Sequence, residues 1–283
     1  ISGSSSVVQL DAWNWEDAAY GIDNAIHLNL PALNAPRSSL FAAATSDKSG
    51  ELNRQALEKT EAIKSFFREA KAYLQETTHT ATNLKQEAVK GLFDNSRKLF
   101  IHAGEVKQML LAIDFVKEFG FNVVIVGGEA SWQIAPLLKA NNIAVILNAA
   151  HRLPFTEDED YDQPFKTPAI LQKAGVLFAL NDDANNARYR NLAFNAGTAA
   201  AFGLTKEEAL SAITLNAAKI VGIDAKTGSI EPGKDANIII SEGDILDMRT
   251  SIITNAFIQG RQVDLASKQT QLYERYMGKY GLK

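Results

Sequence analysis

The stretch KLFIHAGEVKQMLLAIDFVKEFGFNVVIVGG, residues 98–128, decides the fold. Residues 98–103 and 122–127 are apolar runs of strand length, and the segment between them has apolar side chains at helical spacing. Gly120 stands where such a helix would end. Continuous apolar strands are typical of a sheet that is buried on both faces. The stretch therefore predicts a strand–helix–strand unit whose two strands are parallel.

The same alternation continues on both sides of this unit. Further strands are predicted at 144–149 and 176–181, each followed along the chain by a helical segment, and two more at 6–13 and 25–31. About six strands of parallel type result, whereas a closed (β/α)8 barrel has eight. We therefore expect an α/β fold of the incomplete TIM-type barrel class. The chain begins without Met, so we also expect a piece of a longer protein, with the missing units before Ile1 or another chain covering the gap.

The chain divides into two parts by its patterns. Residues 1–204 hold the barrel units, with a mainly helical insertion at 51–96. Residues 205–283 begin with two short helices, the first carrying a capping box of Thr205 and Glu208. A strand near 236–241, a hairpin within 251–263 and a terminal helix follow. These strands predict a small separate β-layer, the C-terminal part of a β-sandwich.

Composition excludes several classes of protein. Among 283 residues, 46% are hydrophobic and 22% charged, which is typical of a soluble globular protein. The net charge of −4 leaves no basic footprint for nucleic acid. No run approaches the roughly 18 apolar residues that span a membrane. The absence of cysteine excludes disulfides and thiolate metal sites, and it leaves the cellular compartment open.

Functional groups in parallel α/β folds gather where the strands end. That rule selects a set of polar or glycine positions: Asn29, His102, Gly127, Gly128, Asn148, Asn181, Asp182 and Asp183. His102 is either a hydrogen-bonded structural residue or a metal ligand or base. Adjacent carboxylates on an extended chain point in different directions, so only one of Asp182 and Asp183 would face a site. The other reading for this pair is a helix cap or a solvated loop.

A long acidic loop, residues 151–165, follows the strand at 144–149. It is either a solvated surface loop or a lid over the site. His151 and Arg152 at its root would bind a substrate carboxylate. His27 and His79 carry less weight. The sequence contains no Walker loop, G-x-S-x-G elbow, H-E-x-x-H helix or dinucleotide fingerprint.

The most specific segment is AITLNAAKIVGIDAKTGSIEPGKDANIIISEGD, residues 212–244, which resembles the C-terminal signature of the amidohydrolase superfamily. That signature places T-x-N-x-A-x-x-x-G on a helix, before G-S-x-x-x-G-K-D-A and a strand. The matching residues are Thr214, Asn216, Ala218, Gly222, Gly228, Ser229, Gly233, Lys234, Asp235 and Ala236. Residues from 98 onward resemble the imidazolonepropionase-like branch of the superfamily.

The resemblance implies a metal-dependent hydrolase of amide-like carbon–nitrogen bonds in small molecules. Members have a (β/α)8 barrel with one or two divalent metals, usually zinc. Their ligands are an H-x-H on strand 1, a Lys or Glu on strand 4, a His on each of strands 5 and 6, and an Asp ending strand 8. His102 matches the strand-5 ligand. Asp183 matches the strand-8 Asp, which is a metal ligand and also takes the proton of the attacking water.

Three members of that ligand set are missing. Gly127 stands where the strand-6 His is expected, no H-x-H occurs in the chain, and residues 25–31 contain no Lys or Glu. Two readings follow: a hydrolase acting on carbon–nitrogen bonds other than peptide bonds with a reduced metal site, or a non-catalytic binding or scaffold protein. Since stable zinc takes three or four protein ligands, we expect the chain as given to hold no tightly bound zinc and to be inactive on amides.

Overall fold

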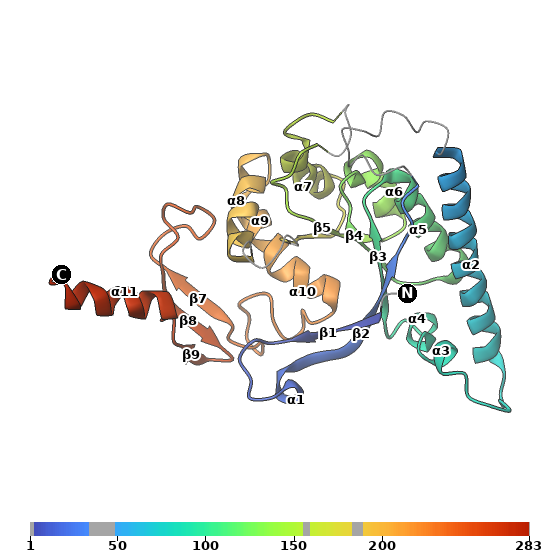
Figure 1. Ribbon diagram of the computed structural model, residues 1–283, viewed down its shortest axis with the longest axis horizontal. Coiled ribbons are helices and arrows are strands. Elements are labelled where there is room, and N and C mark those ends of the chain that lie inside the picture. The colour runs from blue at the N-terminus through green and yellow to red at the C-terminus, as the bar shows by residue number, and fades with distance from the viewer. Residues whose placement is uncertain (1–2, 34–48, 155–158, 183–188, 283) are drawn as a thin grey trace.

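The computed structural model describes residues 3–33, 49–154, 159–182 and 189–282, and its centre is a curved six-stranded sheet. The strands lie in chain order, β1-β2-β3-β4-β5-β6 (Figure 1). Their bounds are β1 Gly3–Val8, β2 Ala19–Asn29, β3 Lys98–Ala103, β4 Val123–Gly127, β5 Ala144–Leu147 and β6 Phe178–Leu180. The expectation that the four strands of the series would be parallel neighbours in order is confirmed.

The first strand corrects the sequence interpretation. β2 pairs with β3 in parallel, but β1 pairs with β2 antiparallel. The reason is the length of the connection. Only residues 9–18, including the one-turn helix α1 (Trp15–Ala18), join the two strands, whereas a parallel crossover needs about a dozen residues or more. The sheet therefore has five parallel strands and one antiparallel edge strand, which is the curled, incomplete TIM-type barrel of an α/β protein.

Helices cover the outer, convex face of this sheet (Figure 1). They are α2 Ser49–Gln75, α5 Val106–Phe119, α6 Ala135–Ala140 and α7 Gln163–Lys173. Gly120 ends α5 in the left-handed conformation, as its position predicts. Phe67 of α2 packs against Phe115 and Phe121 with ring centroids 5.9 and 5.2 Å apart, and all three side chains are buried. This aromatic contact fixes the inserted helix α2 on the sheet layer.

After α2 the insertion continues in two short helices. The structure has α3 (Leu84–Glu87) and α4 (Lys90–Phe93), each of one turn. The chain reverses after α4, and the backbone N–H of Arg97 donates to the carbonyl of Gly91 at 2.8 Å. The Arg97 side chain lies so close over Gly91 that a Cβ there would sit 2.6 Å from it. This reversal delivers the chain directly into β3.

Three helices connect the sheet to the C-terminal part: α8 Leu192–Ala201, α9 Lys206–Ile213 and α10 Leu215–Val221. The predicted capping box of Thr205 and Glu208 begins α9. α10 lies on the inner, concave face, where Ile220 packs with Phe100 and Val124 of the sheet. The concave side of the incomplete barrel is therefore partly filled by this short helix.

A separate three-stranded antiparallel sheet follows, as the sequence predicts. It consists of β7 Ile238–Ser241, β8 Ile253–Ile258 and β9 Arg261–Val263, in that order. Gln259 and Gly260 both have positive φ, 50° and 77°, which suits the tight turn of the β8–β9 hairpin. The terminal helix α11 (Lys268–Lys279) extends beyond this sheet at the far end of the molecule (Figure 1).

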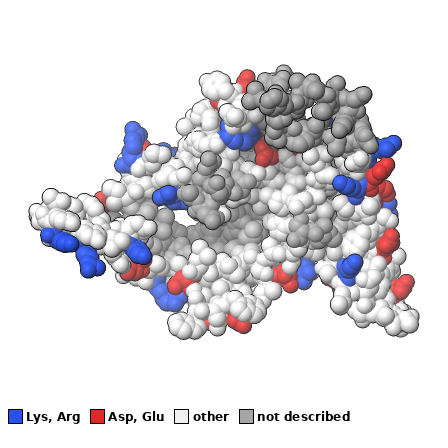
Figure 2. All heavy atoms as spheres, in the orientation of Figure 1, with Lys and Arg blue, Asp and Glu red and all other residues white. Residues whose placement is uncertain are grey.

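The surface carries charges of both signs. On the face shown in Figure 2, basic and acidic side chains are scattered over most of the molecule. This mixed distribution agrees with the small net charge of −4. Among the described residues, no helix combines the length and the apolarity that crossing a membrane requires.

Candidate functional site

Two histidines meet on the concave face, near the ends of β2 and β3. Side chains alternate between the two faces of a strand, and Ala25 and Phe100 face the concave side. His27 and His102, two residues further along their strands, share that face. In the register of the two strands, His27 lies opposite Phe100 and Asn29 lies opposite His102. The sheet thus places the two imidazoles diagonally, within reach of each other.

The two rings make a direct hydrogen bond. His27 Nδ1 lies 2.9 Å from His102 Nε2. One of these nitrogens carries a proton and donates the hydrogen bond, and the other accepts it. Burial lowers the pKa of both imidazoles, and for His27 the neighbouring His102 lowers it further. Both rings are therefore neutral at physiological pH, which leaves the pair able to accept a proton.

A cavity of about 260 Å³ opens beside His27. Its walls are apolar residues of the sheet and of α10, together with Asn181 just after β6. The polar groups are thus few and lie at the strand ends, while the floor is apolar. Such a lining suits a small molecule of which one end is polar.

The end of β4 explains the absence of a histidine there. Gly127 has φ 107°, a conformation that side-chain-bearing residues rarely adopt. A Cβ at this position would lie 3.1 Å from the carbonyl oxygen of Ala103 and 3.1 Å from Glu129 Oε2. The other oxygen of Glu129 accepts a hydrogen bond from Asn148 Nδ2 at 3.0 Å. The backbone path and the Glu129 carboxylate together occupy the space that a larger residue would need.

The other predicted residues lie apart from the histidine pair. His151 Nε2 contacts Thr198 Oγ1 at 3.2 Å, and Arg152 pairs with the buried Glu159, Nη2 to Oε1 at 3.3 Å. Asp182 turns toward α8, where its Oδ2 accepts from Asn195 Nδ2 at 3.2 Å. Asp183, the predicted catalytic residue and metal ligand, lies outside the described residues, as do residues 155–158 of the acidic loop.

Sequence reasoning missed His27 and Glu129. His27 and Asn29 are two residues apart on a predicted strand and so lie on the same face of it. That shared face was the available signal. His79, which was also given little weight, stacks on Tyr73 with ring centroids 3.8 Å apart, on the loop after α2. Glu129 follows a pair of glycines, and no local pattern predicts that its carboxylate folds back over Gly127.

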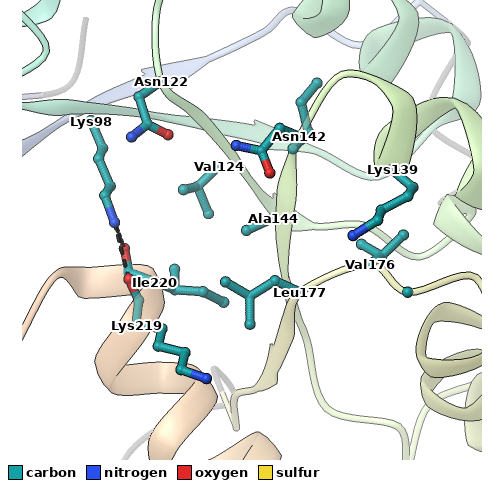
Figure 3. Close-up of a pocket in the computed structure, with 12 residues that line it drawn as sticks. Lys98, Asn122, Val124, Lys139, Asn142, Ala144, Val176, Leu177, Lys219 and Ile220 are labelled. Carbon is teal, nitrogen blue, oxygen red and sulfur yellow. Dashed lines mark hydrogen bonds between the residues drawn. The ribbon is translucent and has the colours of Figure 1, made fainter. Parts of the chain in front are cut away.

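A second cavity, of about 200 Å³, lies at the opposite end of the strands (Figure 3). Lys98 crosses it, and its Nζ donates to the carbonyl oxygens of Lys219 and Ile220 at 3.1 and 2.5 Å. The ammonium thereby satisfies carbonyls in the last turn of α10. Burial lowers the pKa of Lys98. Lys139 also lines this cavity, which contains neither a carboxylate nor an imidazole among the described residues. The polar groups of this cavity thus have a structural role, in contrast to those of the cavity beside His27.

Comparisons with known proteins agree with this architecture. The profile of the amidohydrolase family matches residues 31–265. The chain belongs to the amidohydrolase family. A solved amidohydrolase from Thermotoga maritima superposes with a TM-score of 0.74 at 25% identity, over 93% of this chain and 68% of that one. An imidazolonepropionase of Picrophilus torridus is 35% identical over 150 residues, and one of Thermoplasma volcanium is 35% identical over 85.

These curated relatives are longer than the matched segment. The match covers 52% of this chain and 36% of the Picrophilus protein, and 29% of this chain and 21% of the Thermoplasma protein. The resemblance to the imidazolonepropionase-like branch of the amidohydrolase family is thus confirmed, and the match covers part of the length of each relative.

Members of the amidohydrolase family generally depend on divalent metal ions. No three His, Asp or Glu side chains among the described residues gather closely enough to hold an ion. His27 and His102 direct the facing nitrogens at each other rather than at a common point. Since stable zinc takes three or four protein ligands, the described residues do not fit the metal centre of the family.

Proposed function

We propose that this chain is an amidohydrolase-like hydrolase that acts on carbon–nitrogen bonds other than peptide bonds and has a reduced metal site. Family membership and the similarity to imidazolonepropionases support the reaction class. The observation that carries the reduced site is the hydrogen bond between His27 and His102, at strand ends where the family signature places ligands. The substrate is a small molecule with an amide-like bond.

We assign Asp183 and His102 to the reduced metal site. Both would be ligands of a divalent ion, which is zinc by the family pattern, and Asp183 would also be the proton acceptor. His151 and Arg152 would meet a carboxylate of the substrate. Arg152 already pairs with Glu159, so a substrate carboxylate would have to replace that partner. The low solvent exposure of the Glu159 side chain, 3%, makes this exchange unfavourable and leaves His151 as the better candidate.

The histidine pair is an alternative proton acceptor to Asp183, and it is the one that the described residues support. A neutral imidazole at a cavity wall accepts a proton from water when that water attacks a carbon. The second imidazole, hydrogen-bonded to the first, orients the ring and fixes its tautomer. The lowered pKa values of both rings keep the pair unprotonated and ready for this step at neutral pH.

A non-catalytic binding protein is the second candidate, and Gly127 favours it. The positive φ of Gly127, and the Ala103 carbonyl and Glu129 carboxylate 3.1 Å from where a Cβ would stand, disfavour a ligand side chain at this position. A protein of this kind would keep the cavity beside His27 and bind a small molecule there without turnover.

Turnover of a panel of linear and cyclic amides, with and without added zinc, separates the two candidates. Contrary to the inactivity that the sequence predicts for the chain as given, the hydrolase proposal expects activity that His102→Ala abolishes. His79→Ala, a control on the loop after α2, should leave that activity unchanged. Activity that survives in His102→Ala would overturn the role of the pair. Binding of a panel member by calorimetry without any hydrolysis would establish the non-catalytic candidate instead.

A further inference from the structure

The carboxylate of Asp182 is buried with one oxygen unused. Asn181 lines the concave cavity, so the next residue, Asp182, points to the opposite side of the strand, toward α8. The residue is only 4% exposed. Its Oδ2 accepts from Asn195 Nδ2 at 3.2 Å, whereas Oδ1 has no hydrogen-bond partner in the described structure. A buried acceptor without a partner is costly, and more so when it is charged.

This carboxylate lines a cavity of about 210 Å³ that is distinct from the one beside His27. His151 and Asn195 contribute further polar groups, and Phe194 and Met248 contribute apolar surface. No lysine or arginine is among the described residues that line it. The cavity thus combines a buried carboxylate oxygen that lacks a hydrogen-bond partner with a partly apolar wall.

The hydrogen bonds around the cavity leave it rich in acceptors. Thr198 Oγ1 donates its one proton to the carbonyl of Phe194 at 3.0 Å, so it accepts from His151 Nε2 at 3.2 Å. His151 Nε2 is therefore the donor in this contact. Asn195 uses its amide N–H on Asp182, and its carbonyl oxygen is an acceptor.

We propose that this cavity binds a small organic ammonium ion. The N–H groups of the ligand donate to Asp182 Oδ1, and its hydrocarbon part packs against Phe194 and Met248. A charge-assisted hydrogen bond of this kind is about twice as strong as a neutral one. A divalent metal is a poorer match, since calcium takes about six to eight oxygen ligands and magnesium near-ideal octahedral oxygen coordination. The inference uses neither His27 nor His102, but it shares His151 with the proposed substrate contact; because the test below uses no amide substrate, its failure would leave the proposed hydrolase function standing.

Calorimetric titration of the intact chain with n-butylammonium chloride tests the proposal at constant ionic strength. Wild-type protein should bind it, and should bind n-butanol and tetramethylammonium more weakly, because the first lacks the charge and the second lacks N–H groups. Asp182→Asn should weaken binding by about tenfold or more. Asp264→Asn, which changes an exposed carboxylate near the terminal helix, should leave binding unchanged.

A second variant guards against a folding defect in Asp182→Asn. Met248 is 71% exposed, so Met248→Trp changes the cavity wall without changing the buried carboxylate. It should weaken butylammonium binding while the circular dichroism spectrum stays that of wild type. The proposal is overturned if wild type fails to bind butylammonium, if butanol binds equally well, if Asp182→Asn binds as tightly as wild type, or if Mg²⁺ or Zn²⁺ binds through Asp182 in place of the amine.

Discussion

Nδ1 of His27 lies 2.9 Å from Nε2 of His102, although 75 residues separate the two in the chain. The contact exists because β2 and β3 are parallel neighbours whose register brings both side chains to one face. The resemblance to the amidohydrolase family predicts that His102 is a metal ligand. Here the nitrogen that faces the site is already engaged by a second imidazole, and this relationship governs the predictions for the site.

Both histidines should titrate below the ordinary imidazole pKa of about 6.5. Burial is the main cause for each, and His102 adds to it for His27. NMR titration of the ring protons measures both values. His102→Ala should raise the pKa of His27, since it removes the neighbour and admits water, whereas His79→Ala should not change it. A wild-type pKa of His27 at or above 6.5 would contradict the structure.

The same pKa shifts determine the direction in which the free energy of unfolding changes with pH. Because the folded state disfavours the protonated rings, their contribution to the free energy of unfolding is complete above the unfolded pKa of about 6.5. It decreases as the pH falls through the lowered folded values. Urea unfolding at a series of pH values below neutrality should show this loss, and a His27→Phe variant should show a smaller one.

The chain as given should retain no stoichiometric zinc after dialysis. The described residues offer two imidazoles that bond to each other, and zinc normally takes three or four ligands. Elemental analysis of the dialysed protein is the measurement. One zinc per chain that disappears in His102→Ala would refute the prediction and restore a metal centre built on this residue.

Gly127→Ala should destabilise the fold by about 1–3 kcal/mol, because a residue at φ 107° with a Cβ is strained. The new methyl group would also press on the Ala103 carbonyl and on Glu129. Thermal or urea unfolding gives the change. Gly278→Ala is the matched control: it lies in α11 with open space around it and should be neutral or stabilising by about 0.5–1 kcal/mol. Equal effects of the two changes would argue against strain at Gly127.

Lys98→Met should lower the free energy of unfolding by about 1–3 kcal/mol, since it removes a charged donor from two carbonyls of α10. Lys139→Met changes the same cavity (Figure 3) without removing a hydrogen bond that the structure shows, and should stay within about 0.5 kcal/mol of wild type. Urea unfolding of the two variants side by side makes the comparison. If Lys139→Met is the more harmful change, the capping role of Lys98 is wrong.

Local patterns predicted most strands of the sheet but not the direction of the edge strand β1. Apolar runs located β3 to β6, and the helices between them required a parallel arrangement. The direction of β1 depends on the ten residues that link it to β2, and the predicted strand at 6–13 overran part of that link. The chain reversal after α4 likewise brings Arg97 over Gly91, a contact that propensity does not encode.

The sequence predicts positions of site residues but not which side chains contact each other. His102 was selected because strand ends collect functional groups, and the structure places it on the concave face. Its partner, His27, came from a strand separated from β3 by the long insertion, so only the sheet register reveals the pair. The roles of Asp183, His151 and Arg152 stay predictions. Asp182 shows how alternation decides which of two adjacent carboxylates faces α8.

The sheet order also constrains how the protein folds. From β3 to β6 every strand pairs with the next one in the chain, so these contacts close short loops. β2 reaches β3 only after residues 30–97 have been spanned, and the entropy of closing a loop grows with its length. We therefore expect β3, β4 and β5 to assemble first, with β2 and its partner β1 joining later. The His27–His102 contact would then be among the last to form. Pulse-labelled hydrogen exchange during refolding should show amide protection in β4 before it appears in β2, and the reverse order would contradict this sequence of events.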